Sequence, residues 1–147
     1  MYVCFIDFRT AFDKVIHTCM LYKLLQYTNN GNLYKILKSM YSNDKLCAKI
    51  EDKMTEFFTN EVGVRQGGCT EPTLFKIFIN DLPGILSNTP DCVYLDNEKI
   101  SCLLYSVDLV LMSNSRDGLQ KKVDILYTYC NDWCMEVNVK KNKDHDM

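Results

Sequence analysis

The stretch that most constrains the fold runs from Ile100 to Ser115 and reads ISCLLYSVDLVLMSNS. Two short apolar runs flank a more polar tetrad that begins at Tyr105 and ends at Asp108. Apolar and β-prone residues on both sides of a tight polar break predict a β-hairpin whose turn presents a carboxylate. A purely structural hairpin and an active-site hairpin both fit this stretch when it is taken alone.

A second stretch near the start of the sequence, YVCFIDFRTAFDKVIH, also delivers a carboxylate at the end of an apolar run. The run from Val3 to Ile6 predicts a strand over residues 2–8 that carries Asp7. If this strand lies beside the hairpin, Asp7 and Asp108 come within reach of one cation. Carboxylates that converge on Mg²⁺ are what phosphoryl transfer by two metal ions requires. The alternative is that Asp7 caps the turn that follows it.

A third stretch begins at Gly63 and reads GVRQGGCTEPTLFKIFINDL. Its glycines bracket Arg65 and Gln66 in a loop whose backbone can approach a phosphate or a base closely. Pro72 suits the first turn of a helix, and the apolar residues after it predict a helix with one apolar face over about residues 72–86. The stretch therefore predicts a glycine-rich loop that leads into a helix.

Together, the three stretches resemble the reverse transcriptases of retrotransposons without long terminal repeats. The family's motifs read FIDFxxAFDxVxH, GVRQGCPLSPxLFNxxINDL and LLYADDxVLLS. Here they stand, in the same order, as CFIDFRTAFDKVIH, GVRQGGCTEPTLFKIFINDL and CLLYSVDLVLMS. A fourth family motif, VNxxKT, is matched by the run from Val137 to Lys141, with Asn142 in place of the threonine. The resemblance covers nearly the whole chain.

This resemblance implies a polymerase palm, which is an α+β fold with an antiparallel sheet and helices packed on one face. It implies a single partial domain over residues 1–147, from which the fingers and thumb are largely missing. The implied ancestral reaction is RNA-templated DNA synthesis by two-metal nucleotidyl transfer. The implied partners are an RNA template and a DNA primer, and the implied cofactor is Mg²⁺.

The resemblance also implies roles for single residues. Asp7 and Asp108 would hold the metal ions, and Lys141 would assist the departure of pyrophosphate. The residues implied to contact nucleotide or template are Phe12, Arg65, Gln66, Gly67 and Tyr105. From the residues alone, Phe12 can equally be a core aromatic, and Lys141 can equally belong to a solvated basic tail.

The most important departure from the family lies in the third motif, where Tyr-Ala-Asp-Asp has become Tyr-Ser-Val-Asp. Val107 offers no oxygen to Mg²⁺, which requires hard oxygen ligands in near-octahedral geometry. We do not expect Asp108 to substitute, because successive side chains of a strand point to opposite faces. The sequence therefore predicts an inactive palm. The alternative is a non-catalytic retroelement remnant, or a domain repurposed to bind nucleic acid or protein.

Charge and composition limit the kinds of binding partner and the cellular setting that we expect. The net charge of −2 argues against a strong grip on nucleic acid, which depends on clustered Lys and Arg, so we expect weak and salt-sensitive binding. The first residues lack the features of a signal peptide, and no apolar run approaches the length of a membrane span. An intracellular setting, cytoplasm or nucleus, is expected. The eight cysteines form no C-x-x-C pair and are interpreted as buried, reduced thiols, with Cys130 and Cys134 on one helical face.

The remaining periodicities predict further elements. Helices are expected over residues 18–27, 32–41 and 116–133, and strands over residues 45–51, 54–61, 92–95 and 99–104. Asp52-Lys53 and Asp96-Asn97 are the predicted turns, and Leu82-Pro83-Gly84 is predicted to interrupt the helix after Pro72. On the helix over 32–41, one apolar face is expected to contain Leu33, Ile36, Leu37 and Met40.

Overall fold

The computed structural model describes residues 1–28, 31–42, 44–64 and 70–138. The chain forms two compact units. The first unit is discontinuous and combines Met1–Ala11 with the chain from Ile79 onward, whereas the second unit is the continuous segment Phe12–Phe78. Each unit contains its own helices and its own paired strands.

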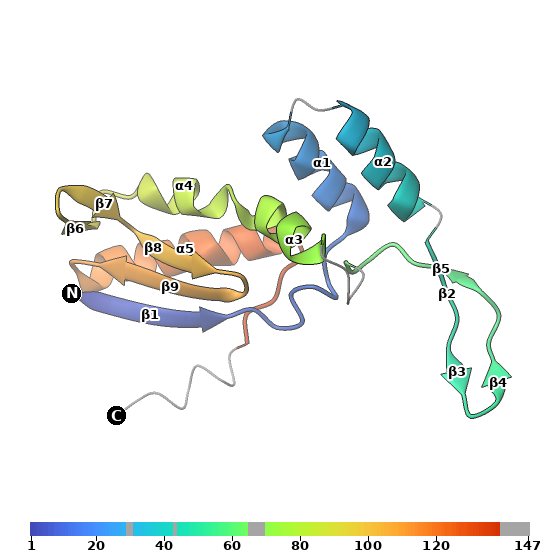
Figure 1. The fold of residues 1–147 in the computed structure, drawn as a ribbon. Coiled ribbons are helices and arrows are strands. Elements are labelled where there is room, and N and C mark those ends of the chain that lie inside the picture. Colours follow the sequence, from blue (N-terminus) through green and yellow to red (C-terminus); the bar gives the residue numbers. More distant parts are fainter. Residues whose placement is uncertain (29–30, 43, 65–69, 139–147) are drawn as a thin grey trace. The chain divides into compact units, whose positions relative to one another are not determined.

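A three-stranded antiparallel sheet in the order β1-β9-β8 forms the centre of the first unit (Figure 1). β1 spans Tyr2–Asp7, β8 spans Cys102–Tyr105 and β9 spans Asp108–Ser113. β1 and β9 pair along their whole length, from Tyr2 opposite Ser113 to Asp7 opposite Asp108. The prediction that the first strand lies beside the hairpin is therefore confirmed.

The two faces of this sheet differ in exposure. On β9, Leu109 and Leu111 are buried, whereas Asp108 is exposed and Val110 is half-buried. The helices α4 (Leu82–Ser87) and α5 (Arg116–Asp132) contact the strands of this sheet and each other. Because the leucines alternate with less buried residues, these helices cover one face of the sheet and leave the other face open.

The helix α5 confirms the prediction for residues 116–133. Its N-cap is Ser115, whose Oγ accepts a hydrogen bond of 3.0 Å from the Gly118 backbone N–H. Toward its other end, the Tyr129 hydroxyl donates a hydrogen bond of 2.7 Å to Asp81 Oδ1, next to the start of α4. Burial raises the pKa of Tyr129, and the Asp81 carboxylate raises it further. The phenol therefore stays protonated and ties α5 to α4.

Gly118 lies in the first turn of α5, although glycine is a poor helix former. A Cβ at this position would overlap Ser113 Oγ and the Asp91 side chain. We therefore expect Gly118→Ala to lower the free energy of unfolding by about 1–3 kcal/mol, the usual cost of overpacking. Urea unfolding measures this loss. Gly84→Ala in α4 is the control, since nothing lies within 4 Å of its added Cβ. A Gly118→Ala variant as stable as the natural chain would contradict the close approach.

A second hairpin in the first unit joins β6 (Val93–Leu95) to β7 (Glu98–Ile100). Its turn residues Asp96 and Asn97 have φ values of 48° and 70°. Two consecutive positive φ values are the signature of the type I′ turn that suits a two-residue hairpin. The predicted turn is confirmed.

In the second unit, α1 (His17–Tyr27) packs against α2 (Gly31–Ser42), and both predicted helices are confirmed. His17 begins α1, where its ring meets Tyr41 edge-on at 4.6 Å and its Nε2 lies 2.7 Å from Gly63 O. Only part of the predicted apolar face of α2 is buried. Leu37 is buried together with Tyr41, whereas the other three residues of that face, Leu33, Ile36 and Met40, are exposed. α2 therefore packs through a narrow i, i+4 stripe.

The segment between α2 and the glycine-rich loop forms a two-stranded arm. Its pairs are β2 (Lys45–Leu46) with β5 (Phe58–Thr59) and β3 (Lys49–Ile50) with β4 (Lys53–Met54). The predicted hairpin is confirmed, but its turn falls one residue earlier than predicted, at Glu51-Asp52. The reason is that Ile50 pairs with Lys53 and that Glu51 takes the positive φ of 55°.

The helix predicted over residues 72–86 is in fact two helices. α3 spans Glu71–Ile79 and α4 begins at Leu82, so the break falls at Asn80-Asp81 and not at Leu82-Pro83-Gly84. Pro83 lies in the first turn of α4, where its missing N–H costs no hydrogen bond. The proline therefore starts a helix where the sequence predicted an interruption.

The cysteines vary in exposure, so the interpretation of all of them as buried thiols is wrong. Cys92 and Cys130 are buried, Cys134 is exposed, and the half-buried ones are Cys4, Cys19, Cys47 and Cys102. Cys134 does not share a helical face with Cys130, because α5 ends at Asp132 and Cys134 has a φ of 54°. Cys69 lies outside the described residues. Within the described ranges, no helix combines the length and the apolarity needed to cross a membrane.

Candidate functional site

The turn of the central hairpin contains only Ser106 and Val107, because Tyr105 and Asp108 are the last pair of the β8-β9 ladder. Ser106 takes a positive φ of 55°, as the first position of a type II′ turn requires. Val107 therefore lies in the turn and belongs to neither strand. This corrects the argument from strand alternation, since alternation does not relate a turn residue to Asp108.

The two aspartates implied as metal ligands lie directly opposite each other in the β1-β9 ladder. Directly opposite residues of an antiparallel pair have Cβ atoms about 4.5–5.5 Å apart and share one face of the sheet. Asp7 and Asp108 therefore share the open face of the sheet, at the end next to the turn. Tyr105 is opposite Asp108 on its other side and is 80% exposed. The structure thus brings together three of the residues predicted for the site.

The last described segment of the chain completes the surroundings of Asp7. Asn138 Nδ2 donates a hydrogen bond of 3.0 Å to Asp7 Oδ2, and the Asn138 backbone N–H donates one of 2.8 Å to Asp7 O. Next to this contact, Phe8 and Val137 form an isolated antiparallel β-bridge. The Arg9 backbone N–H donates a hydrogen bond to Glu136 O. Residues 136–138 therefore follow the edge of β1 that β9 does not occupy.

Asn138 is a site residue that the sequence reasoning did not assign. Its only signal was its place in the fourth motif, next to Val137. The hydrogen bond fixes one carboxylate oxygen of Asp7, which limits the rotation of that side chain. A carboxylate oriented in this way presents its ligand atoms in a defined direction, as outer-shell hydrogen bonds do in metal sites.

The donor set suits a hard divalent cation in part. Two adjacent carboxylates repel each other, and a cation between them would relieve that repulsion. Mg²⁺ commonly takes one or two carboxylates and completes its octahedron with water and phosphate oxygens, so Asp7 and Asp108 fit one such ion. Among the described residues, no group of three or more His, Cys, Asp or Glu side chains could hold a metal. An aspartate at position 107 would add the third carboxylate.

Other predicted site residues lie elsewhere or outside the described residues. Phe12 belongs to the second unit, where its ring packs on Phe75 with centroids 4.9 Å apart. That contact fits the core alternative for Phe12, and its role toward a nucleotide stays a prediction. The predicted residues outside the described ranges are Arg65, Gln66, Gly67 and Lys141.

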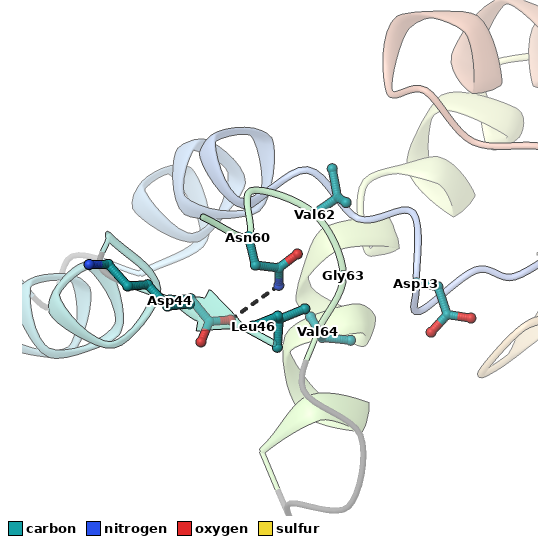
Figure 2. A pocket seen from close by; sticks show the side chains of 8 residues that line it. Asp13, Asp44, Leu46, Asn60, Val62, Gly63 and Val64 are labelled. Carbon is teal, nitrogen blue, oxygen red and sulfur yellow. Dashed lines mark hydrogen bonds between the residues drawn. The ribbon is translucent and has the colours of Figure 1, made fainter. Parts of the chain in front are cut away.

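A separate depression of about 630 Å³ lies in the second unit, beside the start of the glycine-rich loop (Figure 2). Inside the depression, Asn60 Nδ2 donates a hydrogen bond of 3.2 Å to Asp44 Oδ2. Gly63 forms part of the wall, and its backbone has a φ of 86°. A Cβ on Gly63 would lie 3.2 Å from Asp13 O, so the backbone approaches closely there. The lining of this depression contains none of the predicted site residues. It consists of Asp13, Asp44, Lys45, Leu46, Asn60, Val62, Gly63 and Val64.

Comparison with known proteins decides the family. The sequence model of the family described as "Reverse transcriptase (RNA-dependent DNA polymerase)" matches residues 1–145. This chain belongs to the reverse transcriptase family. The match includes β1, the glycine-rich loop, the central hairpin and the segment beside Asp7.

Relatives of this reverse transcriptase chain come from mobile elements without long terminal repeats, which confirms the resemblance. The "RNA-directed DNA polymerase from mobile element jockey" of Drosophila melanogaster is 27% identical over 143 residues, which cover 93% of this chain and 15% of that protein. The jockey polymerase of Drosophila funebris is 27% identical over 144 residues, or 94% of this chain and 15% of that protein. The "Probable RNA-directed DNA polymerase from transposon BS" of Drosophila melanogaster is also 27% identical over 144 residues, which cover 93% of this chain and 15% of that protein. The chain spans about 15% of the length of these relatives.

Proposed function

We propose that this reverse transcriptase domain is a polymerase palm, ancestrally used for RNA-templated DNA synthesis, and that its catalytic centre is inactive. The observation that carries the proposal is the pairing of Asp7 with Asp108 next to a turn that contains Val107. Two carboxylates converge on the open face of the sheet, and an apolar side chain occupies the position where the family has a third.

In this proposal, Asp7 and Asp108 would hold Mg²⁺, and Asn138 keeps the Asp7 carboxylate in place. In the ancestral reaction, the metal would supply activation of the attacking hydroxyl and neutralisation of charge on the leaving phosphates. The exposed ring of Tyr105, opposite Asp108, is positioned to stack on a base or sugar.

The remaining roles follow the family pattern and are part of the same proposal. Phe12 would lie under the incoming sugar, and Lys141 would assist the release of pyrophosphate. The glycine-rich loop with Arg65, Gln66 and Gly67 would contact template and nucleotide. An RNA template and a DNA primer are the proposed partners, bound weakly because the chain carries a net charge of −2, in an intracellular setting.

Inactivity follows from the missing carboxylate. Two-metal transfer needs protein oxygen ligands for both ions. Asp7 and Asp108 alone would hold one Mg²⁺, and the turn would offer no ligand to a second. Valine cannot compensate, because its methyl groups offer no lone pair.

A non-catalytic binding domain is the second candidate function. The observation that favours it is the open sheet face, where Phe5 and Leu103 flank Val110 and are exposed. An apolar face next to an exposed tyrosine can bind single-stranded nucleic acid by stacking or a protein by apolar contact. This role would not need the metal ligands.

Paramagnetic Mn²⁺ tests the metal site directly. We expect Mn²⁺ to broaden the amide NMR signals of residues around Asp7 and Asp108 in the natural chain, and we expect Asp7→Asn to remove that effect because it neutralises one of the two ligands. Asp96→Asn, in the exposed β6-β7 turn, is the matched control and should leave the broadening unchanged. Broadening that persists at this site in Asp7→Asn would refute the proposed ligand pair and favour the second candidate.

A further inference from the structure

A buried cluster of polar side chains lies in the first unit, away from the paired aspartates. Lys122 of α5 is 0% exposed, and Cys92, just before β6, is 1% exposed. An ammonium group buried to this degree is costly unless hydrogen bonds and an opposite charge compensate it. The contacts of Lys122 therefore indicate which groups compensate its buried charge.

The Lys122 ammonium reaches three acceptors. Nζ donates to Asp91 O at 2.9 Å, to Met112 O at 2.5 Å and to Cys92 Sγ at 3.8 Å. The two carbonyl oxygens are neutral, whereas the sulfur becomes an anion when it loses its proton. Cys92 can therefore supply the negative charge that this buried ammonium needs.

Several groups around Cys92 favour that ionised form, although the protonated thiol donates a hydrogen bond of 3.2 Å to Thr89 O. Its Sγ lies 2.8 Å from Ser101 Oγ, which can donate to a thiolate. Burial by itself raises the pKa of Cys92, but the hydrogen bonds of Ser101 and Thr89 and the charges of Lys122 and Lys99 outweigh burial and lower it. The contrast is Cys130, where burial raises the pKa to about 11. Thiolate character is what makes a cysteine open to oxidation.

We propose that Cys92 and Lys122 form a redox modification site, in which a peroxide oxidises Cys92 and the Lys122 amine then closes a covalent sulfenamide bond to its sulfur. The Lys122 Nζ lies 3.8 Å from the Cys92 Sγ inside a closed cluster. Sulfenic acids condense with a backbone nitrogen in this way, and a free amine such as that of Lys122 is a stronger nucleophile than an amide nitrogen. No other amine is in contact with this sulfur in the described part of the chain.

The reaction balances with hydrogen peroxide as the oxidant. The Cys92 thiolate attacks one peroxide oxygen, the O–O bond breaks, and the departing hydroxide takes a proton from the Lys122 ammonium to become water. The free amine then attacks the sulfenic sulfur, the S–O bond breaks, and this hydroxide takes a proton from the new S–N nitrogen. Sulfur loses two electrons, peroxide gains them, and two waters leave.

Access depends on the short loop between α4 and β6. Pro90 is exposed and Asp91 is half-buried, so Cys92 lies directly beneath the surface of this loop. Local opening of such a loop admits a small oxidant. Once the loop closes again, Lys122 is the nucleophile in contact with the sulfur, which favours the cross-link over further oxidation.

Peptide mass spectrometry of the peroxide-treated, folded 147-residue chain tests the proposal. We expect a linked peptide pair that contains Cys92 and Lys122, is lighter than the sum of the two peptides by two hydrogens, and disappears after treatment with dithiothreitol. Lys121→Met, at the exposed neighbouring lysine, should keep the link. Lys122→Met should lose it and accumulate Cys92 as sulfinic acid.

The natural chain alone decides the outcome, so a folding defect in Lys122→Met does not weaken the test. Recovery of Cys92 as a free thiol or a sulfinic acid without the linked pair would overturn the proposal. A disulfide from Cys92 to Cys102 in place of the link would overturn it as well.

Discussion

The Val107→Asp variant should bind Mg²⁺ and Mn²⁺ more tightly than the natural chain. With residues 1–147 grafted into a full-length reverse transcriptase, it should raise primer extension by roughly 10²–10³-fold, the range for one group that stabilises transition-state charge. The reason is that a carboxylate in the turn would join Asp7 and Asp108 as a third oxygen donor. Metal binding should recover before synthesis, because synthesis also requires a positioned primer and template.

The turn can accept this change. Val107 is half-buried and lies in a two-residue turn, where aspartate is a favoured residue and a β-branched side chain is not. Val107→Asn is the matched control, since it has nearly the same shape as the aspartate but no charge, and we expect it to restore little. Robust synthesis by the graft that carries Val107 would show that Asp7 and Asp108 suffice, and the inactive assignment would then be wrong.

Leu111→Ala should cause a large loss of stability in the first unit. Leu111 is 0% exposed on the central strand β9, between Cys4 of β1 and Cys102 of β8. Removing a fully buried leucine side chain costs about 2–5 kcal/mol, because transfer energy is lost and a cavity remains. Urea unfolding followed by circular dichroism measures the change in the free energy of unfolding.

Leu103→Ala is the control for that measurement, because it deletes the same atoms from the open face of the same sheet. Leu103 is 56% exposed on β8, so its truncation should cost well under the loss at Leu111. Equal losses at the two positions would mean that both faces of the sheet are covered in solution. The assignment of an open face next to Asp7 and Asp108 would then fail.

The parts of the fold that the sequence predicted well are those that depend on local pattern. β1 and the central hairpin follow from short apolar runs around polar turns, and α5 follows from helical spacing after the N-cap Ser115. The sequence does not predict the break at Asn80-Asp81, because apolar residues continue on both sides of it and Pro83 resembles a helix breaker. A proline has opposite meanings inside a helix and in its first turn.

The candidate site was predictable only in part, for a similar reason. The motifs led to Asp7 and Asp108, and their pairing follows once β1 lies beside β9. The hydrogen bond from Asn138 to Asp7 joins residues 131 positions apart. Hydrophobic periodicity carries no information about such a contact, because the contact depends on which edge of β1 residues 136–138 reach.

The discontinuous build of the first unit determines the order in which the chain can fold on the ribosome. β1 is made before its partner β9, which begins at Asp108, and the whole second unit is synthesised between them. At about 5–20 residues per second, β1 waits on the order of ten seconds for a neighbour. Phe12–Phe78 is continuous and can complete its own contacts during that interval. During this interval the nascent chain therefore carries an apolar strand without its partner strand, and this is the stage at which binding by a chaperone would matter most.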